Sequence, residues 1–262
     1  MKKTNIFTFL LFVVLLIAVA LFMALRPALS GSKGQTEESP DKEALTEGAG
    51  AAGDNIAEEE KLPEKKVEAS MEDALFIGDS RTVGLSEYSA MDEADFFSNI
   101  GMSVYNIYDK TVSVSKVGKV TLTQLLDNKK YGKIYVMLGI NEVGYDMEKT
   151  VEKYRELVES IEEKQPGAKI FIQANLHVTR DRSDKDNIVN NRNINRLNKA
   201  ISHIADDKKV FYLDANALFD DENGNLSKDK SDDDTHLYAK HYIEWGKWIR
   251  EKTGEILAEE QL

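Results

Sequence analysis

"ALFIGDSRTVG", residues 74–84, joins a short apolar run to a glycine, an aspartate, a serine and an arginine. The apolar part is typical of a buried β-strand, and the residues after it predict a turn into a helix. At the carboxyl end of a parallel strand, the first backbone amides of such a helix point towards an incoming anion. Ser80 is therefore either a helix cap in an ordinary turn or a nucleophile, and the rest of the chain has to distinguish the two.

Short apolar runs of the same kind recur along the chain, rich in Ile, Val, Phe and Tyr and mostly closed by Gly, Asn or Asp: residues 94–99, 133–139, 169–175 and 209–215. Segments with helical spacing of apolar residues lie between and after them, most clearly residues 147–164, 186–207 and 238–257. This alternation predicts a flavodoxin-like, three-layer α/β/α domain with a five-stranded parallel sheet. In that architecture, ligand-binding and catalytic residues lie at the carboxyl ends of the strands.

The N-terminal part of the chain does not look globular. Residues 6–25 carry no charged side chain, and as a helix they would span roughly 30 Å, the thickness of a bilayer core. We therefore predict a single transmembrane helix that makes residues 1–26 a membrane anchor, with a cleaved signal peptide as the alternative. Lys2 and Lys3 precede the span and only Arg26 follows it, which places the rest of the chain outside the cytoplasm.

Residues 27–70 are rich in Ala, Gly, Glu, Ser and Lys and contain no aromatic residue. Such a composition cannot bury enough apolar surface to offset its ordering entropy, so a disordered, flexible tether is predicted. Residues 71–262 remain as one domain. The net charge of −12 opposes binding to phosphate polymers, so nucleic acid is not expected as a partner, and the absence of cysteine excludes disulfides and a thiol nucleophile.

Three further fragments fall at the carboxyl ends of predicted strands. "SNIGMS" places Gly101 after the second strand, and "GINE" places Asn141 after the third. "DDDTHLYAKHY" brings Asp233 and His236 three residues apart before the last helix, close enough for a carboxylate to orient an imidazole. Taken alone, each fragment is also compatible with a turn glycine, a loop asparagine or an acidic capping loop.

Together the fragments resemble the SGNH (GDSL-type) hydrolase/esterase family, which carries Ser, Gly, Asn and His blocks in this order and an aspartate three residues before the histidine. The resemblance covers residues 72–250 and rests on "GDS", "GIN" and Asp233-x-x-His236-Leu. It implies Ser80 as nucleophile, His236 as base and Asp233 as its orienting carboxylate. It also implies an oxyanion hole formed by the amides of Ser80 and Gly101 and the side chain of Asn141, without metal or cofactor.

Two positions depart from the commonest family pattern: Arg81 follows the serine, and Glu142 follows the asparagine. These departures bear on the substrate, so both residues are expected to line its pocket. His177 follows the fourth strand and either lines the pocket as well or is structural, with Asp181 and Asp184 nearby.

The remaining polar candidates have weaker assignments. His203 and His241 lie in predicted helices, where packing or surface roles are expected, and the asparagine-rich residues 187–198 either face a substrate or form a helix face. The histidine spacing matches no metal-binding motif, so no metal site is expected.

The sequence thus predicts a membrane-tethered, extracytoplasmic serine esterase that hydrolyses carboxylic esters, with O-acetyl or short acyl groups on cell-envelope or extracellular carbohydrate as the expected substrates. One alternative is an O-acetyltransferase acting on peptidoglycan or another wall polymer, because both reactions share the acyl-enzyme. A second alternative is a non-catalytic surface binding module with the same fold. Protein partners are not predicted.

Overall fold

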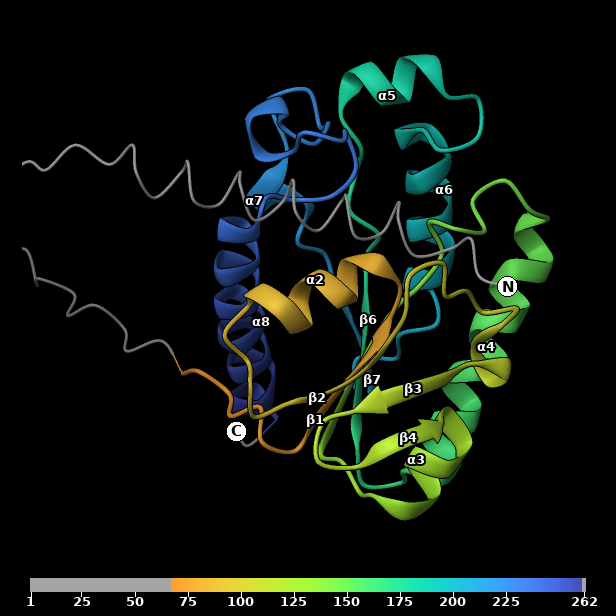
Figure 1. The fold of residues 1–262 in the computed structure, drawn as a ribbon, viewed down its shortest axis with the longest axis vertical. Helices are drawn as coiled ribbons and strands as arrows, with labels where there is room; N and C mark the ends of the chain where they lie inside the picture. Colours follow the sequence, from red (N-terminus) through yellow and green to blue (C-terminus); the bar gives the residue numbers. More distant parts are fainter. Residues whose placement is uncertain (1–66, 261–262) are drawn as a thin grey trace, which may run out of the picture. The chain divides into compact units, whose positions relative to one another are not determined.

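The computed structural model describes residues 67–260, and its centre is a five-stranded, all-parallel sheet (Figure 1). The strands lie in the order β2-β1-β5-β6-β7, with the bounds β1 (Ala74–Gly78), β2 (Asp95–Ser98), β5 (Lys133–Met137), β6 (Lys169–Gln173) and β7 (Val210–Leu213). The predicted flavodoxin-like sheet is confirmed. The strand order reverses beside β1, and the carboxyl ends of β1 and β5 form the crevice where such folds bind ligands.

Helices cover both faces of the sheet because the strand side chains are apolar on both sides. Alternate residues such as Leu75 and Ile77 face one layer, and Ala74 and Phe76 face the other. The first layer contains α3 (Leu122–Asn128), α4 (Met147–Lys164) and α6 (Asn191–Ser202). The second contains α2 (Ser80–Tyr88), α7 (Asn216–Phe219) and α8 (Ala239–Glu259).

A row of five aromatic rings crosses the sheet beneath α2 and α8. Phe96, Phe76, Tyr135, Phe171 and Phe211 occupy matching register positions on successive strands. Their neighbouring centroids lie 5.0, 4.3, 4.9 and 5.5 Å apart, and each pair is stacked. Such pairs stabilise beyond their buried area, so the row joins all five strands under the two helices nearest the catalytic candidates.

Several elements were not predicted from the sequence. Between β2 and β5 the chain forms an antiparallel hairpin of β3 (Thr111–Val114) and β4 (Gly118–Thr121), preceded by the 3-10 helix η1 (Ile107–Asp109). The short helix α5 (Arg180–Lys185) follows β6, and the 3-10 helix η2 (Lys228–Lys230) precedes the loop of His236. In Figure 1, α5 lies above the carboxyl edge of the sheet, beside α6.

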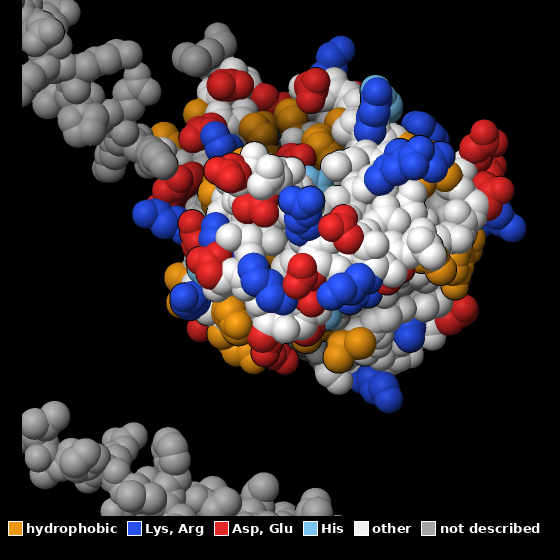
Figure 2. Space-filling model, turned by 90° about the horizontal axis from the view of Figure 1, so that it is seen from above, with side chains coloured by type: hydrophobic (Ala, Val, Ile, Leu, Met, Phe, Trp, Pro, Cys, Tyr) orange, Lys and Arg blue, Asp and Glu red, His pale blue; other side chains and the backbone are white. Residues whose placement is uncertain are grey.

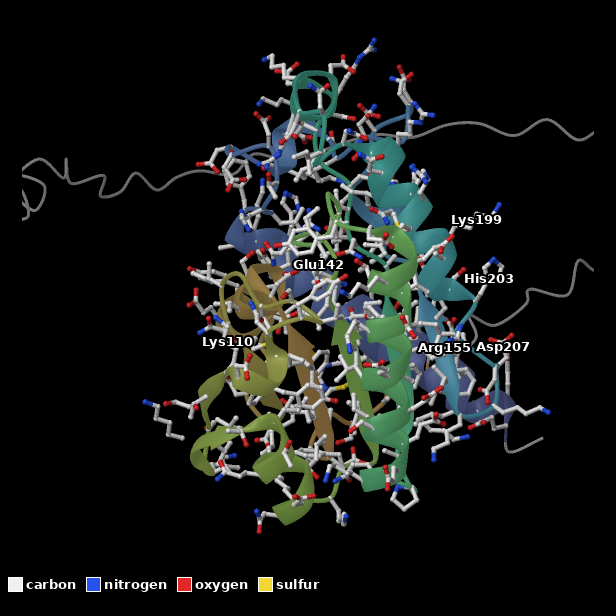
Figure 3. The ribbon with its side chains drawn as sticks, turned by 90° about the vertical axis from the view of Figure 1, so that its right-hand side faces the viewer. Lys110, Glu142, Arg155, Lys199, His203 and Asp207 are labelled. Carbon is white, nitrogen blue, oxygen red and sulfur yellow. The ribbon has the colours of Figure 1, made fainter. Side chains whose placement is uncertain are left out.

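The helix predicted over residues 186–207 is shorter at both ends. Asp186 accepts hydrogen bonds from the amides of Ile188 and Val189, which makes a turn, and Asn190 then caps α6 through the amide of Asn193. His203 therefore follows the helix instead of lying within it, and Figure 3 shows it pointing away from the body of the protein.

Residues 67–70, at the start of the described part of the chain, also differ from the prediction. The expected membrane-spanning helix, and residues 27–66 of the expected tether, lie outside the described residues. No helix within residues 67–260 is long and apolar enough to cross a membrane. Residues 67–70, predicted as tether, instead pack on α8: Ala69 donates its amide to the Arg250 carbonyl at 3.0 Å, and a Cβ on Gly254 would overlap Val67. The prediction was wrong there because these contacts involve residues far along the chain.

Candidate active site

Ser80 lies at the N-terminus of α2, immediately beyond the carboxyl end of β1. A Cβ on Gly78 would overlap Thr82 and lie 2.6 Å from the Met137 carbonyl oxygen, so the tight exit from the strand requires glycine. Asp79 caps α2 by accepting the amide of Arg81 at 3.0 Å, and its complete burial raises the pKa of its carboxyl group. Strand, turn and cap together fix the position of the serine hydroxyl.

Ser80, His236 and Asp233 form a hydrogen-bonded chain. The Ser80 Oγ lies 2.9 Å from His236 Nε2, and His236 Nδ1 lies 2.6 Å from Asp233 Oδ2. Asp233 Oδ1 also accepts the backbone amides of His236 and Thr235 at 2.7 and 2.9 Å. Burial opposes ionisation of Asp233, but these hydrogen bonds outweigh it and lower its pKa to about 2.

The state of the aspartate determines the direction of the other hydrogen bonds. A carboxylate only accepts hydrogen bonds, so Nδ1 of His236 carries a proton and donates a hydrogen bond to Asp233. In the neutral imidazole, Nε2 is then the acceptor for the Ser80 hydroxyl. The arrangement can remove the serine proton without further rearrangement.

The loops after β2 and β5 meet beside Ser80. Gly101 adopts φ +73° in the first of these loops, a conformation that favours glycine, and the Asn141 Nδ2 donates to the Met102 carbonyl at 2.9 Å. That bond uses one of the two Nδ2 hydrogens and holds the loops together. The amides of Ser80 and Gly101 donate to no acceptor within residues 67–260. These N–H groups, at the ends of three strands, are the candidate donors to an oxyanion.

Arg81 was expected to line the pocket but is only 1 % exposed. Its Nη2 lies 3.5 Å from the Thr235 carbonyl, which connects α2 to the loop of His236, and its burial lowers the pKa of the guanidinium group against the opposing effect of Asp79. The expectation was wrong because the side chain is buried and reaches the Thr235 carbonyl instead of solvent.

Glu142 is also 1 % exposed, and Figure 3 shows it inside the carboxyl edge of the sheet. Its Oε1 accepts the Val104 amide at 2.7 Å, so it joins the loops after β2 and β5 from below. Burial raises its pKa to about 7. Glu142 therefore supports the loop of Asn141 and does not line the pocket, contrary to the expectation.

Both ring nitrogens of His177 have hydrogen-bond partners outside the chain of Ser80, His236 and Asp233. Its Nδ1 lies 2.8 Å from Asp220 Oδ2 and its Nε2 lies 2.7 Å from Asn195 Oδ1, while Asp181 and Asp184 make no such contact. Burial opposes protonation, but the two acceptors outweigh it and raise the histidine pKa. With both ring nitrogens hydrogen-bonded and the side chain 10 % exposed, the geometry favours the structural alternative for His177 over a place in the pocket.

The asparagine-rich segment acquires a role that the sequence left open. Asn198 exchanges two hydrogen bonds with the backbone of Asn175, and Asn191 exchanges two with the backbone of Val178. Thr179, at the end of this irregular segment, then bonds to the backbone and side chain of Asp234. The seven-residue spacing of the two asparagines, two helical turns, was the sequence feature that placed them on one face. They position the loop that carries Asp233 and His236.

Two clefts open near these loops. One of about 610 Å³ meets the candidate site at Asp233, while Ser80 and His236 do not line it; its lining residues are Asp181, Arg182, Lys185, Asp186, Asn187, Ile188, Asp233 and Asp234. Figure 2 looks down on this edge of the molecule and shows acidic and basic side chains intermingled over it.

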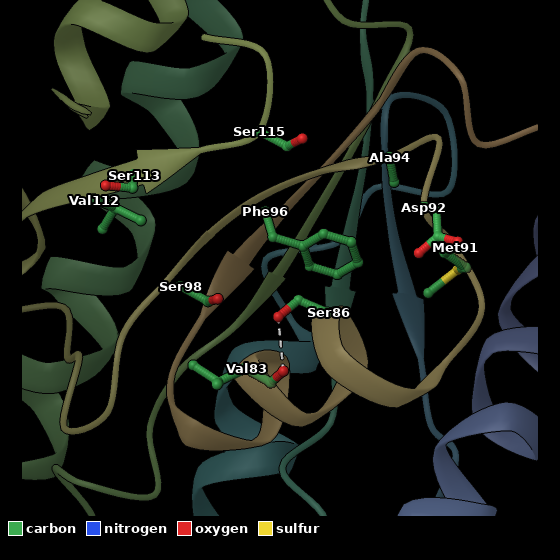
Figure 4. Close-up of a pocket in the computed structure, with 10 residues that line it drawn as sticks. All are labelled: Val83, Ser86, Met91, Asp92, Ala94, Phe96, Ser98, Val112, Ser113 and Ser115. Atoms are coloured by element: carbon green, nitrogen blue, oxygen red, sulfur yellow. Dashed lines mark hydrogen bonds between the residues drawn. The ribbon is translucent and has the colours of Figure 1, made fainter. Parts of the chain in front are cut away.

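The second cleft, of about 410 Å³, lies between α2, β2 and β3 and is shown in Figure 4. Ser80, Asp233 and His236 do not line it. Within residues 67–260, no group of three His, Cys, Asp or Glu side chains is arranged to hold a metal ion.

Comparisons with known proteins identify the family of the chain. The model of the GDSL-like Lipase/Acylhydrolase family matches residues 76–242, which include all five predicted catalytic and oxyanion residues. No curated protein matches the chain significantly.

Solved structures of similar fold have low sequence identity to the chain. A Streptococcus pneumoniae protein provisionally described as a platelet activating factor has a TM-score of 0.57 and 20 % identity, covering 72 % of this chain and 86 % of its own. A GDSL-like lipase from Bacteroides thetaiotaomicron has a TM-score of 0.51 and 16 % identity, covering 73 % and 90 %. An acetyl xylan esterase has a TM-score of 0.50 and 16 % identity, covering 67 % and 96 %. These similarities show the fold.

Proposed function

This chain belongs to the GDSL-like lipase/acylhydrolase family, and we propose that Ser80 is the nucleophile with which it hydrolyses carboxylic esters. The family assignment makes the protein a serine ester hydrolase. The observation that carries the assignment of residues is the continuous hydrogen-bonded chain from Ser80 through His236 to Asp233, with distances of 2.9 and 2.6 Å.

The geometry supports a two-step reaction. His236 Nε2 takes the proton of Ser80 while Oγ bonds to the ester carbonyl carbon, and the negative charge moves to the carbonyl oxygen. The amides of Ser80 and Gly101 and the Asn141 Nδ2 donate to that oxygen. When the carbon–oxygen bond to the alcohol breaks, His236 returns the proton to the leaving oxygen.

The second step repeats the first with water in place of the serine. His236 takes a proton from water, the hydroxyl oxygen bonds to the acyl carbon, and the bond to Ser80 Oγ breaks as Oγ regains a proton. The carboxylate of Asp233 stabilises the imidazolium in both steps without taking its proton, as its low pKa requires.

The substrate and location belong to the same proposal. The proposed substrate is an acetyl or short acyl ester of a carbohydrate in the cell envelope or its surroundings, which is compatible with the fold shared with an acetyl xylan esterase.

The uncharged residues 6–25 support a membrane anchor with the domain outside the cytoplasm. The full-length protein should remain with membranes on fractionation, and protease added to wall-stripped cells should release the domain. A soluble secreted form without its first thirty residues would contradict the anchor.

Labelling with a fluorophosphonate, which reacts with activated serines, tests the nucleophile without knowledge of the substrate. Ser80→Ala should abolish labelling, His236→Ala should nearly abolish it, and Asp233→Ala should weaken it less. His177→Ala is the matched control, since that imidazole is bonded elsewhere, and it should still be labelled. Labelling that persists in folded Ser80→Ala, or a folded wild type that is not labelled, would refute the assignment.

A further inference from the structure

The cleft of about 610 Å³ lies between the segment that follows β6 and the loop that carries Asp233 and His236, and neither Ser80 nor His236 is among its lining residues. On one side Asp233 and Asp234 line it, immediately before His236. On the other side Ile188 reaches the loop of Asn141, because a Cβ on Gly144 would lie 2.5 Å from Ile188 Cγ2. A molecule in the cleft would therefore contact Asp233, the carboxylate that is hydrogen-bonded to the imidazole of the proposed base.

The proposed reaction requires the alcohol to occupy this side of the serine. His236 Nε2 has to deliver its proton to the alcohol oxygen as the ester bond breaks, so that oxygen must come within hydrogen-bond distance of the imidazole. The rest of the alcohol then extends past His236 towards Asp233, which lines the cleft. The acyl group is bonded to the same carbon but points away from the departing oxygen.

The lining of the cleft indicates which alcohols it can accept. Six of its eight lining residues are charged, and Arg182 has a buried Nε without a hydrogen-bond partner among the described residues, although its Nη1 donates to Thr235 Oγ1 at 2.6 Å. A hydrocarbon chain would have to strip water from these groups without replacing its hydrogen bonds, which is costly. A fatty alcohol is therefore disfavoured.

The balance of charge in the cleft argues against an anionic alcohol as well. Two cationic side chains, Arg182 and Lys185, face four acidic ones on its walls. An alcohol with many hydroxyl groups can both accept from the cations and donate to the carboxylates. Ile188, 55 % exposed, offers an apolar surface for the C–H face of a sugar ring.

We infer that this cleft is the binding site for the alcohol portion of the ester and that it selects a neutral, polyhydroxylated alcohol, namely a sugar. The inference rests on the proposed function of Ser80 and His236. Because the acyl-enzyme forms by a reversible step, the same cleft also receives any sugar hydroxyl that competes with water for the acyl group. Lys185 and Asn187, whose side chains reach the cleft from α5 and the following loop, are specificity-determining residues of this site.

The test compares esters that share the acetyl group and differ in the alcohol, using full-length protein in detergent. The substrates are an acetylated neutral xylo-oligosaccharide, an acetylated oligogalacturonide as the anionic sugar, octyl acetate and 4-nitrophenyl acetate. All four form the same acetyl-enzyme, so differences in kcat/KM arise in acylation. The wild type should prefer the neutral sugar to the anionic sugar and to octyl acetate.

The double variant Lys185→Ala, Asn187→Ala should lower the ratio of kcat/KM for the neutral sugar to that for 4-nitrophenyl acetate about tenfold or more, the effect of losing one to two hydrogen bonds. Lys199→Ala removes an exposed lysine that points outward from α6 (Figure 3) and should leave the ratio unchanged. An unchanged ratio in the double variant, or a wild type that prefers octyl acetate or the anionic sugar, would overturn the inference.

The two proposals fail in different ways. If wild-type protein is labelled at Ser80 and hydrolyses 4-nitrophenyl acetate but not the neutral sugar ester, the cleft is not a sugar site while the serine assignment stands. If the folded wild type is not labelled at Ser80 and hydrolyses none of the four esters, the proposed function itself fails and the inference falls with it.

Discussion

Replacing Glu142 by glutamine should remove a pH-dependent loss of stability. The carboxyl group is buried, its Oε1 accepts the Val104 amide, and its Oε2 has no hydrogen-bond partner among the described residues. Burial and the nearby Asp79 raise its pKa from an ordinary 4.5 to about 7, against the lowering effect of the Val104 hydrogen bond. Glutamine keeps the shape and the acceptor oxygen but cannot ionise.

The sign and size of the effect follow from proton linkage. Below pH 4.5 the carboxyl group of Glu142 is protonated in both the folded and the unfolded chain, so its titration does not change the free energy of unfolding. Between pH 4.5 and about 7 the unfolded chain ionises first, so the free energy of unfolding falls as pH rises. A difference of roughly 2.5 pKa units at 1.36 kcal/mol each gives a loss of about 3 kcal/mol.

Urea unfolding followed by tryptophan fluorescence measures this loss, because Trp245 is buried. The difference in free energy of unfolding, Glu142→Gln minus wild type, should rise by about 3 kcal/mol between pH 4 and pH 8. Taking the difference cancels the titrating groups that do not interact with Glu142; Asp79 does interact with it and contributes to the shift. A difference that stays constant to about 0.5 kcal/mol across that range would show that Glu142 does not titrate there, and would refute the reasoning.

Three further outcomes are expected. Asn141→Ala should lower kcat/KM about a hundredfold or more with little change in urea midpoint, the usual cost of removing one oxyanion donor; unchanged kinetics would make it a loop residue only. Gly84→Ala should destabilise the fold by about 1–3 kcal/mol, because the new Cβ would lie 2.5 Å from Tyr242 Cε1 where α2 packs on α8; an unchanged midpoint would contradict that packing. Asp220→Asn should cost more stability at pH 5.5 than at pH 9, since the raised pKa of His177 gives stability that is present below 6.5 and lost as pH rises; equal losses would show that the pair is not ionic.

The local sequence pattern was sufficient to predict the parallel sheet and to select the candidate residues around Ser80. Five apolar runs predicted five parallel strands, since a strand buried on both faces has to be continuously apolar. Because the carboxyl ends of parallel strands share one edge, residues after different strands could be assigned to one site from chain order alone. The hairpin β3–β4 was missed because its two four-residue strands, Thr111–Val114 and Gly118–Thr121, are too short and too polar to show a clear period.

Burial and long-range pairing were decided only by the tertiary structure. From the sequence, Arg81 and Glu142 were expected to line the substrate pocket. Both are buried, because α2 and the loop after β5 turn their side chains inward. His177 pairs with Asp220, which lies 43 residues away in the sequence, and not with Asp181 or Asp184, which are closer in the sequence.

The sequence by itself therefore determined the five strands of the parallel sheet and the candidate reactive groups, because periodicity and residue chemistry are local properties. The structure alone decided which polar groups face solvent, which carboxylate pairs with His177, and which charged residues surround the proposed sugar cleft. Those outcomes depend on contacts between segments far apart in the chain, and the free energy of each contact is set by the packing around it.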